Sequence, residues 1–278
     1  MKPQITIDSI SLKVVDLDRS IQFYQGVLGF QVIDREDCKA TLGINKTPFL
    51  YIHQPDGIKP KEARRSGLYH FAILLPNRVE LGSFLHHMIK SGYPLQGASD
   101  HLVSEAIYFA DPDGNGIEVY ADRPSDTWKW INGEVKMATI PLDVKNLLSV
   151  SEGKAWNAMP IGTTIGHIHL HVSELKESEK FYTEGLDFDV VTRYGGQALF
   201  ISYDQYHHHI GLNTWNGVGA PAASENSVGM IHYTIKFRDA EKLSKIIEQL
   251  KLLGALVIQE REHWKTIDPS GNQIVLSV

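Results

Sequence analysis

An internal repeat constrains this chain more than any other feature of its sequence. Ser9–Tyr24 (SISLKVVDLDRSIQFY) aligns without a gap on His167–Tyr182 (HIHLHVSELKESEKFY), at a constant offset of 158 residues and with seven identities. In both copies apolar residues alternate over the first six positions, as in a strand with one buried face, and then follow the spacing of a short amphipathic helix. A segment that occurs twice predicts a fold assembled from repeated units.

A second pair of related segments follows the first pair along the chain. HFAILL, from His70, and HYTIKF, from His232, each precede a helical run, and Asp-Pro followed by Gly-Asn comes before the last strand of each unit, at Asp111 and Asp268. These residue types favour tight turns. The order of one strand, one helix and about three strands is therefore predicted four times, over residues 5–60, 67–122, 164–216 and 228–278.

The predicted fold belongs to the α+β class, with four βαβββ modules forming two curved, mostly antiparallel sheets around cavities. One face of each first strand is almost entirely apolar and is expected to pack under a helix, which leaves the polar face to line a cavity. We expect an N-terminal domain over residues 1–125, a surface-packed linker over 126–163 and a C-terminal domain over 164–278. Within the linker, Val144–Val150 is predicted to form a short helix.

Histidine is concentrated on the polar face of these first strands. His167, His169 and His171 share one face because side chains alternate along a strand. His70 and His232 occupy the position of His167 in units two and four, whereas unit one has a serine there. The concave face is therefore predicted to carry imidazoles from several units.

The composition excludes several classes of protein. Of the 278 residues, 42% are hydrophobic and 22% are charged, as in globular proteins in solution. The formal net charge of −6 argues against general binding to nucleic acids or to anionic membranes. The single cysteine, Cys38, permits no internal disulfide. Neither a signal sequence nor a membrane-spanning run is expected, so the predicted location is cytoplasmic.

The repeated unit resembles that of the vicinal oxygen chelate superfamily, which includes glyoxalase I, extradiol dioxygenases and bleomycin-resistance proteins. The Phe-Tyr helix ends and the DPDGN turn carry this resemblance. Four segments are most similar to the bacterial catechol-2,3-dioxygenase group, namely GLYHFAILLP, SDHLVSEAIYFADPDGNGIEVYADRP, IGHIHLHVSELKE and YHHHIGLNTW. The resemblance implies a metal-dependent extradiol ring-cleaving dioxygenase that opens catechol or a substituted catechol with O2 to a muconic semialdehyde.

In that superfamily, metal ligands lie at the start of the first strand and in the middle of the last strand of a unit. Carried over to this sequence, these positions imply His70, Glu118 and His167 as the metal ligands. Two imidazoles and one carboxylate form the facial set of non-haem Fe(II) oxygenases, so Fe(II) is the expected cofactor, with Mn(II) or Zn(II) as alternatives.

This ligand set requires units two and three to share one cavity, whereas units three and four do so in ordinary extradiol dioxygenases. Here units three and four offer His167 and His232 with Val275, which leaves that pairing without a carboxylate. The pairing of the units and the role of His232 stay open at this point.

The resemblance also implies catalytic residues. His209, with His208 beside it, matches a histidine near the metal in a His-His segment, and Tyr108 precedes Glu118 by ten residues, as the family's tyrosine does. An imidazole, with an unperturbed pKa of about 6.5, can take a proton from catechol and return it later. Tyr108 is expected to hydrogen-bond the ring oxygen, and His101 is a further candidate for the rim of the cavity.

Two other classes of function stay open. A glyoxalase-like lyase or isomerase would use Zn(II) or Ni(II) at the same cavity, usually with two carboxylates or Gln plus Glu, whereas one carboxylate is evident here. A metal-free binding or resistance protein would sequester a small aromatic molecule. That function would not explain why His70, Glu118 and His167 are all present. The expected partners are an aromatic diol and O2, without nucleic acid or membrane, and a homo-oligomer is an open alternative.

Overall fold

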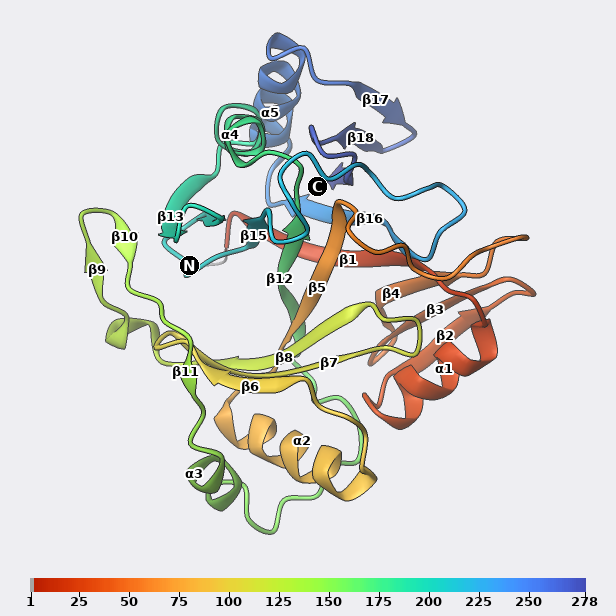
Figure 1. Ribbon diagram of the computed structural model, residues 1–278, viewed down its shortest axis with the longest axis vertical. Helices are drawn as coiled ribbons and strands as arrows, with labels where there is room; N and C mark the ends of the chain where they lie inside the picture. Colours follow the sequence, from red (N-terminus) through yellow and green to blue (C-terminus); the bar gives the residue numbers. More distant parts are fainter. Residues whose placement is uncertain (1–2) are drawn as a thin grey trace.

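The computed structural model describes residues 3–278, in which one strand, one helix and three strands follow one another four times (Figure 1). Unit one comprises β1 (Ile5–Lys13), α1 (Leu17–Gly26), β2 (Gln31–Arg35), β3 (Lys39–Ile44) and β4 (Thr47–His53). Unit two comprises β5 (Gly67–Leu74), α2 (Arg78–Ser91), β6 (Gly97–Asp100), β7 (Ser104–Ala110) and β8 (Gly116–Asp122). Unit three comprises β12 (Thr164–His171), α4 (Leu175–Lys180), the π turn Phe181–Gly185, β13 (Asp189–Tyr194), β14 (Ala198–Ser202) and β15 (Ile210–Asn213). Unit four comprises β16 (Gly229–Phe237), α5 (Ala240–Leu252), β17 (Val257–Glu260), β18 (His263–Ile267) and β19 (Gln273–Ser277). The predicted α+β class and the fourfold repeat are confirmed.

The sheet pairs the units across the two halves of the chain. In every unit the first strand runs parallel to the last strand, as β5 does to β8. The first strands then pair antiparallel between halves, β5 with β12 and β1 with β16. Units two and three therefore build one curved sheet and units one and four build another, and the contact of Ile7 with Ile165 links them into one continuous ladder.

Within each half, a tyrosine holds two units together. The Tyr24 hydroxyl donates a hydrogen bond to Asp111 Oδ2 (2.9 Å), and the Tyr182 hydroxyl donates one to Asp268 Oδ2 (3.1 Å). Both aspartates begin the turns before the last strands, and their Oδ1 atoms accept backbone N–H groups of those turns. The Phe-Tyr and Asp-Pro motifs therefore stabilise the same contact, which joins unit one to unit two and unit three to unit four.

The segment between the halves packs mainly on unit two. It contains β9 (Trp130–Ile131), β10 (Glu134–Val135), β11 (Ile140–Pro141) and α3 (Val144–Ser149). β11 pairs with β6, and α3 lies on α2, where Gly82 leaves room for the backbone of Leu147. Figure 1 shows α2 and α3 at one end of the molecule and α4 and α5 at the other, with the strands between them. The predicted short helix after Asp143 is present.

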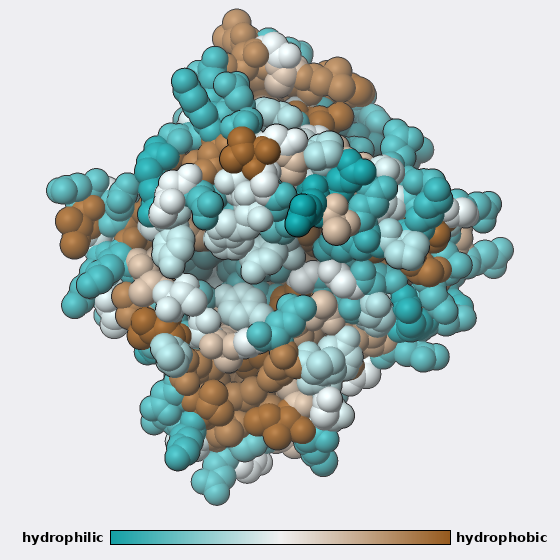
Figure 2. Space-filling model, viewed as in Figure 1, coloured by the Kyte–Doolittle hydropathy of each residue, from teal (hydrophilic) through white to brown (hydrophobic). Residues whose placement is uncertain are grey.

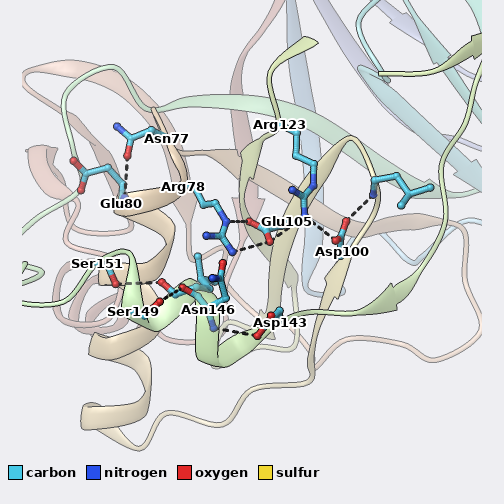
Figure 3. Close-up of polar contacts among 12 residues, drawn as sticks. Asn77, Arg78, Glu80, Asp100, Glu105, Arg123, Asp143, Asn146, Ser149 and Ser151 are labelled. Atoms are coloured by element: carbon cyan, nitrogen blue, oxygen red, sulfur yellow. Dashed lines mark hydrogen bonds and ion pairs between the residues drawn. The ribbon is translucent and has the colours of Figure 1, made fainter. Parts of the chain in front are cut away.

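An ion-pair cluster fixes the start of α2 to the sheet (Figure 3). The Glu105 carboxylate is buried on β7 between Arg78 and Arg123, each of which donates to its Oε1 atom over 3.1 Å. Arg123 also pairs with Asp100 Oδ2 (2.7 Å), and Asn77 Oδ1 accepts the Glu80 N–H as the cap of the helix. The cluster lies on the helix-covered side of the sheet, because Glu105 and the cavity-lining Tyr108 are an odd number of residues apart.

Apolar side chains are exposed at both ends of the molecule in Figure 2, whereas a hollow near the middle of that face is surrounded by residues of intermediate hydropathy. Among residues 3–278, no helix combines the length and the apolar character that crossing a membrane requires.

Candidate metal centre

Three adjacent strands bring His70, Glu118 and His167 together. β5 lies between β8 and β12, and Ala72 of β5 is in register with both Glu118 of β8 and His167 of β12. His70 lies two residues before Ala72, so it points to the same face of the sheet. The small side chain of Ala72 leaves the space above β5 free for the three larger side chains. The two halves of the chain thus contribute to one site through strand register alone.

The ligand atoms of the three residues converge on one point. Glu118 Oε2 lies 3.1 Å from His70 Nε2 and 3.2 Å from His167 Nε2, and all three residues are buried. Donors at about 2.1 Å from a metal and at right angles to one another are about 3.0 Å apart, which these distances match. Within residues 3–278 this is the one group of three or more histidine, cysteine or acidic side chains whose ligand atoms converge in this way.

The protonation of the site suits a metal ion. Burial lowers the pKa of His167 to about 4, so the imidazole is neutral near pH 7 and has a lone pair to offer. Burial alone would raise the pKa of Glu118, but the two imidazoles outweigh it and hold the pKa well below its usual range. His70 Nε2 is buried and lies 3.1 Å from Glu118 Oε2, but it makes no well-aligned hydrogen bond, which is costly without a ligand. The residues present therefore fit a divalent metal.

A cavity of about 390 Å³ opens beside the three residues. That volume is in the range of small-molecule sites. Unit two, unit three and the segment between the halves all contribute to its wall. The aromatic part of the wall comes from Tyr69, Tyr108, Phe109, Tyr194, Phe200 and Trp215. A flat aromatic ring is the kind of molecule that such a wall accommodates.

Tyr108 and His101 form a hydrogen-bonded pair in this wall. His101 Nδ1 lies 2.8 Å from the Ala138 carbonyl oxygen, which can only accept, so Nδ1 donates. For a neutral ring, Nε2 then accepts the Tyr108 hydroxyl over 2.6 Å. Burial raises the pKa of Tyr108 well above 10, so the phenol keeps its proton. Both residues line the cavity, at positions that allow contact with a bound molecule.

The structure places His208, and not His209, at the cavity. The His208 ring centroid lies 4.0 Å from that of His167. His209 turns its Nδ1 atom to the Tyr203 N–H (3.2 Å) and the Ser202 hydroxyl (2.9 Å), and it is absent from the described residues that line the cavity. Of these two neighbouring histidines, His208 alone is among the described residues that line the cavity. The resemblance had put His209 first with His208 beside it, and a catalytic role for either residue stays a prediction.

The corresponding position between units one and four lacks the donors. Thr234 is in register with Val275 and with Ser9, whose hydroxyl donates to that of Thr234 over 3.1 Å. His232 lies two residues before Thr234, as His70 does before Ala72. No described carboxylate lies at the Glu118 position there, because β19 carries Val275 instead.

Three features of the site were missed in the sequence. Ala72 was visible only as an apolar strand residue, and its importance is its small size between the candidate ligands Glu118 and His167. Gly211 allows the His169 ring to lie flat against β15, since a Cβ atom there would come within 2.8 Å of that ring. Met137, Ala138 and Thr139 bring the segment between the halves to the cavity. A glycine in a strand is a recognisable signal of close approach, whereas the other two features had none.

The chain matches known proteins over nearly its whole length. The model of the Glyoxalase/Bleomycin resistance protein/Dioxygenase superfamily matches residues 6–119 and 164–276. A protein of Bacillus subtilis (strain 168) named catechol-2,3-dioxygenase is 44% identical over 262 residues, which cover 93% of this chain and 92% of that protein.

Solved structures show the same fold at low sequence identity. Glyoxalase I from Zea mays superimposes with a TM-score of 0.61 at 17% identity, covering 98% of this chain and 92% of that one. A putative dioxygenase from Bacillus subtilis subsp. subtilis str. 168 gives a TM-score of 0.66 at 12% identity, covering 99% of this chain and 86% of the other. At these identities the two structures speak to the fold alone.

Proposed function

Because the chain belongs to the glyoxalase, bleomycin resistance protein and dioxygenase superfamily, we propose that it is an Fe(II)-dependent extradiol dioxygenase. It opens catechol or a simple substituted catechol with O2 to a muconic semialdehyde, in the breakdown of aromatic compounds. The observation that carries the proposal is the convergence of His70, Glu118 and His167 beside an aromatic-walled cavity. The 44% identity to a protein named catechol-2,3-dioxygenase supports the choice of reaction.

In this proposal His70, Glu118 and His167 hold the metal through two imidazole Nε2 atoms and one carboxylate oxygen. Ligands on one face leave the opposite positions open for exogenous molecules. When bound, Fe(II) would supply coordination sites for both catechol oxygens and for O2, together with electron transfer between them. We further propose that residues 1–125 and 164–278 act as one catalytic unit, since each contributes ligands.

The other residues of the cavity handle the substrate. His208 is the group placed to take a proton from a catechol hydroxyl, because its neutral ring lies against His167 at the cavity surface. Tyr108 donates a hydrogen bond to His101, so its hydroxyl oxygen remains available at the cavity wall to accept a hydrogen bond from the substrate. Phe200 and Trp215 flank the space for the ring, and their apolar surfaces exclude water from it.

The test is anaerobic loading of the purified chain with Fe(II), followed by catechol and O2. We expect O2 consumption that matches catechol loss, together with a yellow ring-opened product. Parallel samples with Mn(II) and with Zn(II) identify the metal that supports turnover. A protein that binds catechol tightly but consumes no O2 with any of these metals would be a binding protein, and turnover of a hemithioacetal without O2 would make it glyoxalase-like.

A further inference from the structure

A hydrogen-bonded chain leads from a carboxylate on β8 to the cavity. Asp122 Oδ1 lies 2.8 Å from His207 Nε2, and His207 Nδ1 lies 2.7 Å from His208 Nδ1. Asp122 ends the strand that carries Glu118, whereas the two histidines lie in the loop between β14 and β15. The hydrogen-bonded chain therefore crosses from one half of the protein to the other. It includes neither the proposed metal ligands nor the pair formed by Tyr108 and His101.

The middle of this chain is sealed from water. His207 is fully buried, with the rings of Tyr206 and Trp128 4.2 and 5.1 Å from its own. The Tyr206 hydroxyl reaches the same oxygen of Asp122 over 3.3 Å and lies 2.7 Å from that of Tyr120. Trp128 belongs to the segment between the halves, so that segment covers the network from outside. Buried polar groups arranged in this way hold one geometry.

The chemistry of the groups gives the chain a direction. An ionised carboxylate only accepts hydrogen bonds, so His207 Nε2 must donate to Asp122. A neutral His207 then accepts at Nδ1, and the donor to it is His208 Nδ1–H. A neutral His208 ring carries one N–H group and one lone pair. Its Nε2 atom, which has no hydrogen-bond partner among residues 3–278, is left with its lone pair.

We propose that Asp122 and His207 are positioning residues that hold His208 as the Nδ1–H tautomer, with the Nε2 lone pair directed into the cavity. The proposal rests on the proposed function, in which His208 takes the catechol proton. In that step the O–H bond breaks, an Nε2–H bond forms, and the resulting positive charge lies one imidazole away from the Asp122 carboxylate. If His207 were protonated on both nitrogens, its Nδ1–H would donate to His208 Nδ1. His208 would then carry its proton on Nε2 and present to the cavity an N–H group that cannot take a proton.

The tautomer of His208 can be read without metal or substrate. In the full-length chain labelled with ¹⁵N at histidine, two-bond proton–nitrogen correlations distinguish Nδ1–H from Nε2–H rings. We expect His208 as the Nδ1–H form in the unaltered metal-free protein, and a mixture of tautomers in Asp122→Asn. Tyr206→Phe is the matched control, since it removes a hydroxyl from the same Asp122 oxygen without interrupting the chain.

Turnover of the Fe(II)-loaded variants gives an independent measure. Loss of the partner that orients a metal-ligating imidazole costs about 10- to 100-fold in metal affinity or activity, and we take the same scale for His208. We expect a fall of this size in kcat for Asp122→Asn and for His207→Gln, with iron content and the KM for catechol unchanged. Asp122→Glu should recover much of the loss because it keeps the carboxylate, and Tyr206→Phe should stay within about twofold of the unaltered protein.

Three results would overturn the proposal. The first is an Nε2–H ring for His208 in the unaltered protein, and the second is a tautomer that Asp122→Asn leaves unchanged. The third is a kcat for Asp122→Asn equal to that of Tyr206→Phe. In each of these cases the unaltered protein could still cleave catechol. The experiments therefore distinguish failure of the positioning role of Asp122 and His207 from failure of the proposed function. A protein that cleaves no catechol at all would remove the base role of His208 together with the function.

Discussion

His70 and His167 come from opposite halves of the chain, yet their ring centroids lie 5.6 Å apart. They meet because β5 and β12 are antiparallel neighbours in which His167 faces Ala72, two residues from His70. Glu118 joins them from β8, on the other side of β5. The candidate metal site therefore depends on the sheet between units two and three, and a substitution that leaves this sheet intact tests the site separately from the fold.

Replacement of a ligand should abolish metal binding. His167→Ala removes one of the three proposed protein donors, so we expect loss of stoichiometric Fe(II) and of ring cleavage. His232→Ala is the matched control, because it removes the histidine at the equivalent strand position of unit four, where no carboxylate faces it. Iron analysis and O2 consumption measure both variants, and equal iron retention in the two would show that His167 is not a ligand.

The carboxylate position should distinguish the two possible cavities. Glu118→Gln keeps the shape of the side chain but removes its charge, and we expect a loss of metal affinity and turnover far larger than that of Val275→Ala. Val275 occupies the equivalent place on β19 between units one and four. Metal titration by calorimetry, alongside kcat for catechol, provides the comparison. Similar effects of the two substitutions would contradict a site between units two and three.

Enlarging Ala72 should disturb the site without disturbing the sheet. Valine suits a strand, but its methyl groups would enter the space between Glu118 and His167, and overpacking of this kind costs about 1–3 kcal/mol. We expect Ala72→Val to lower the unfolding free energy of the metal-free protein by about this amount, to leave the strand content unchanged, and to weaken metal binding by about tenfold or more. Thr234→Val, at the equivalent position of unit four, is the control and should bind metal normally.

The metal-free protein should lose stability in mild acid. Burial lowers the pKa of His232 to about 4 and that of His209 to about 3. Because the unfolded chain takes up these protons near pH 6.5, stability is complete above that pH and falls as the pH drops toward the folded values. Between pH 7 and pH 5 each residue contributes about 2 kcal/mol of loss.

Urea unfolding of the metal-free chain at pH 7 and at pH 5 measures this loss. His232→Gln removes one titrating group, so the difference in unfolding free energy between the two pH values should shrink by about 2 kcal/mol. A variant with the same pH dependence as the unaltered protein would mean that His232 is not held neutral by burial.

The Glu105 cluster should contribute to stability and not to chemistry. Glu105→Gln weakens three hydrogen bonds from two arginines to a buried carboxylate, and bonds to charged groups contribute about 1.5–3 kcal/mol each. We expect a loss of about 2 kcal/mol in unfolding free energy with kcat for catechol unchanged. Glu241→Gln, which removes the exposed pair with Lys245, should leave the unfolding free energy nearly unchanged. Equal losses of unfolding free energy in the two variants would show that the buried Glu105 cluster contributes no more to stability than an exposed ion pair.

Much of the architecture was predictable because it rests on local patterns. Alternating apolar residues, Phe-Tyr helix ends and Asp-Pro turns occur at fixed spacing, and each predicts its element without reference to distant parts of the chain. The repeat of these patterns predicted four units, and the same strand position pointed to His70 and His167. The superfamily resemblance then supplied Glu118, Tyr108 and the His208–His209 segment as candidates.

What the amino-acid sequence determined by itself was the unit, its fourfold repetition and the residue types available for chemistry. The tertiary structure alone decided that units two and three face each other and that His208, and not His209, reaches the cavity. It also decided that His207 and Asp122 are linked to His208 by hydrogen bonds. The physical reason is that local pattern specifies which face of a strand is buried, whereas strand partners depend on the register between segments nearly a hundred residues apart. Register is settled by the packing of the whole sheet, which no short stretch of sequence contains.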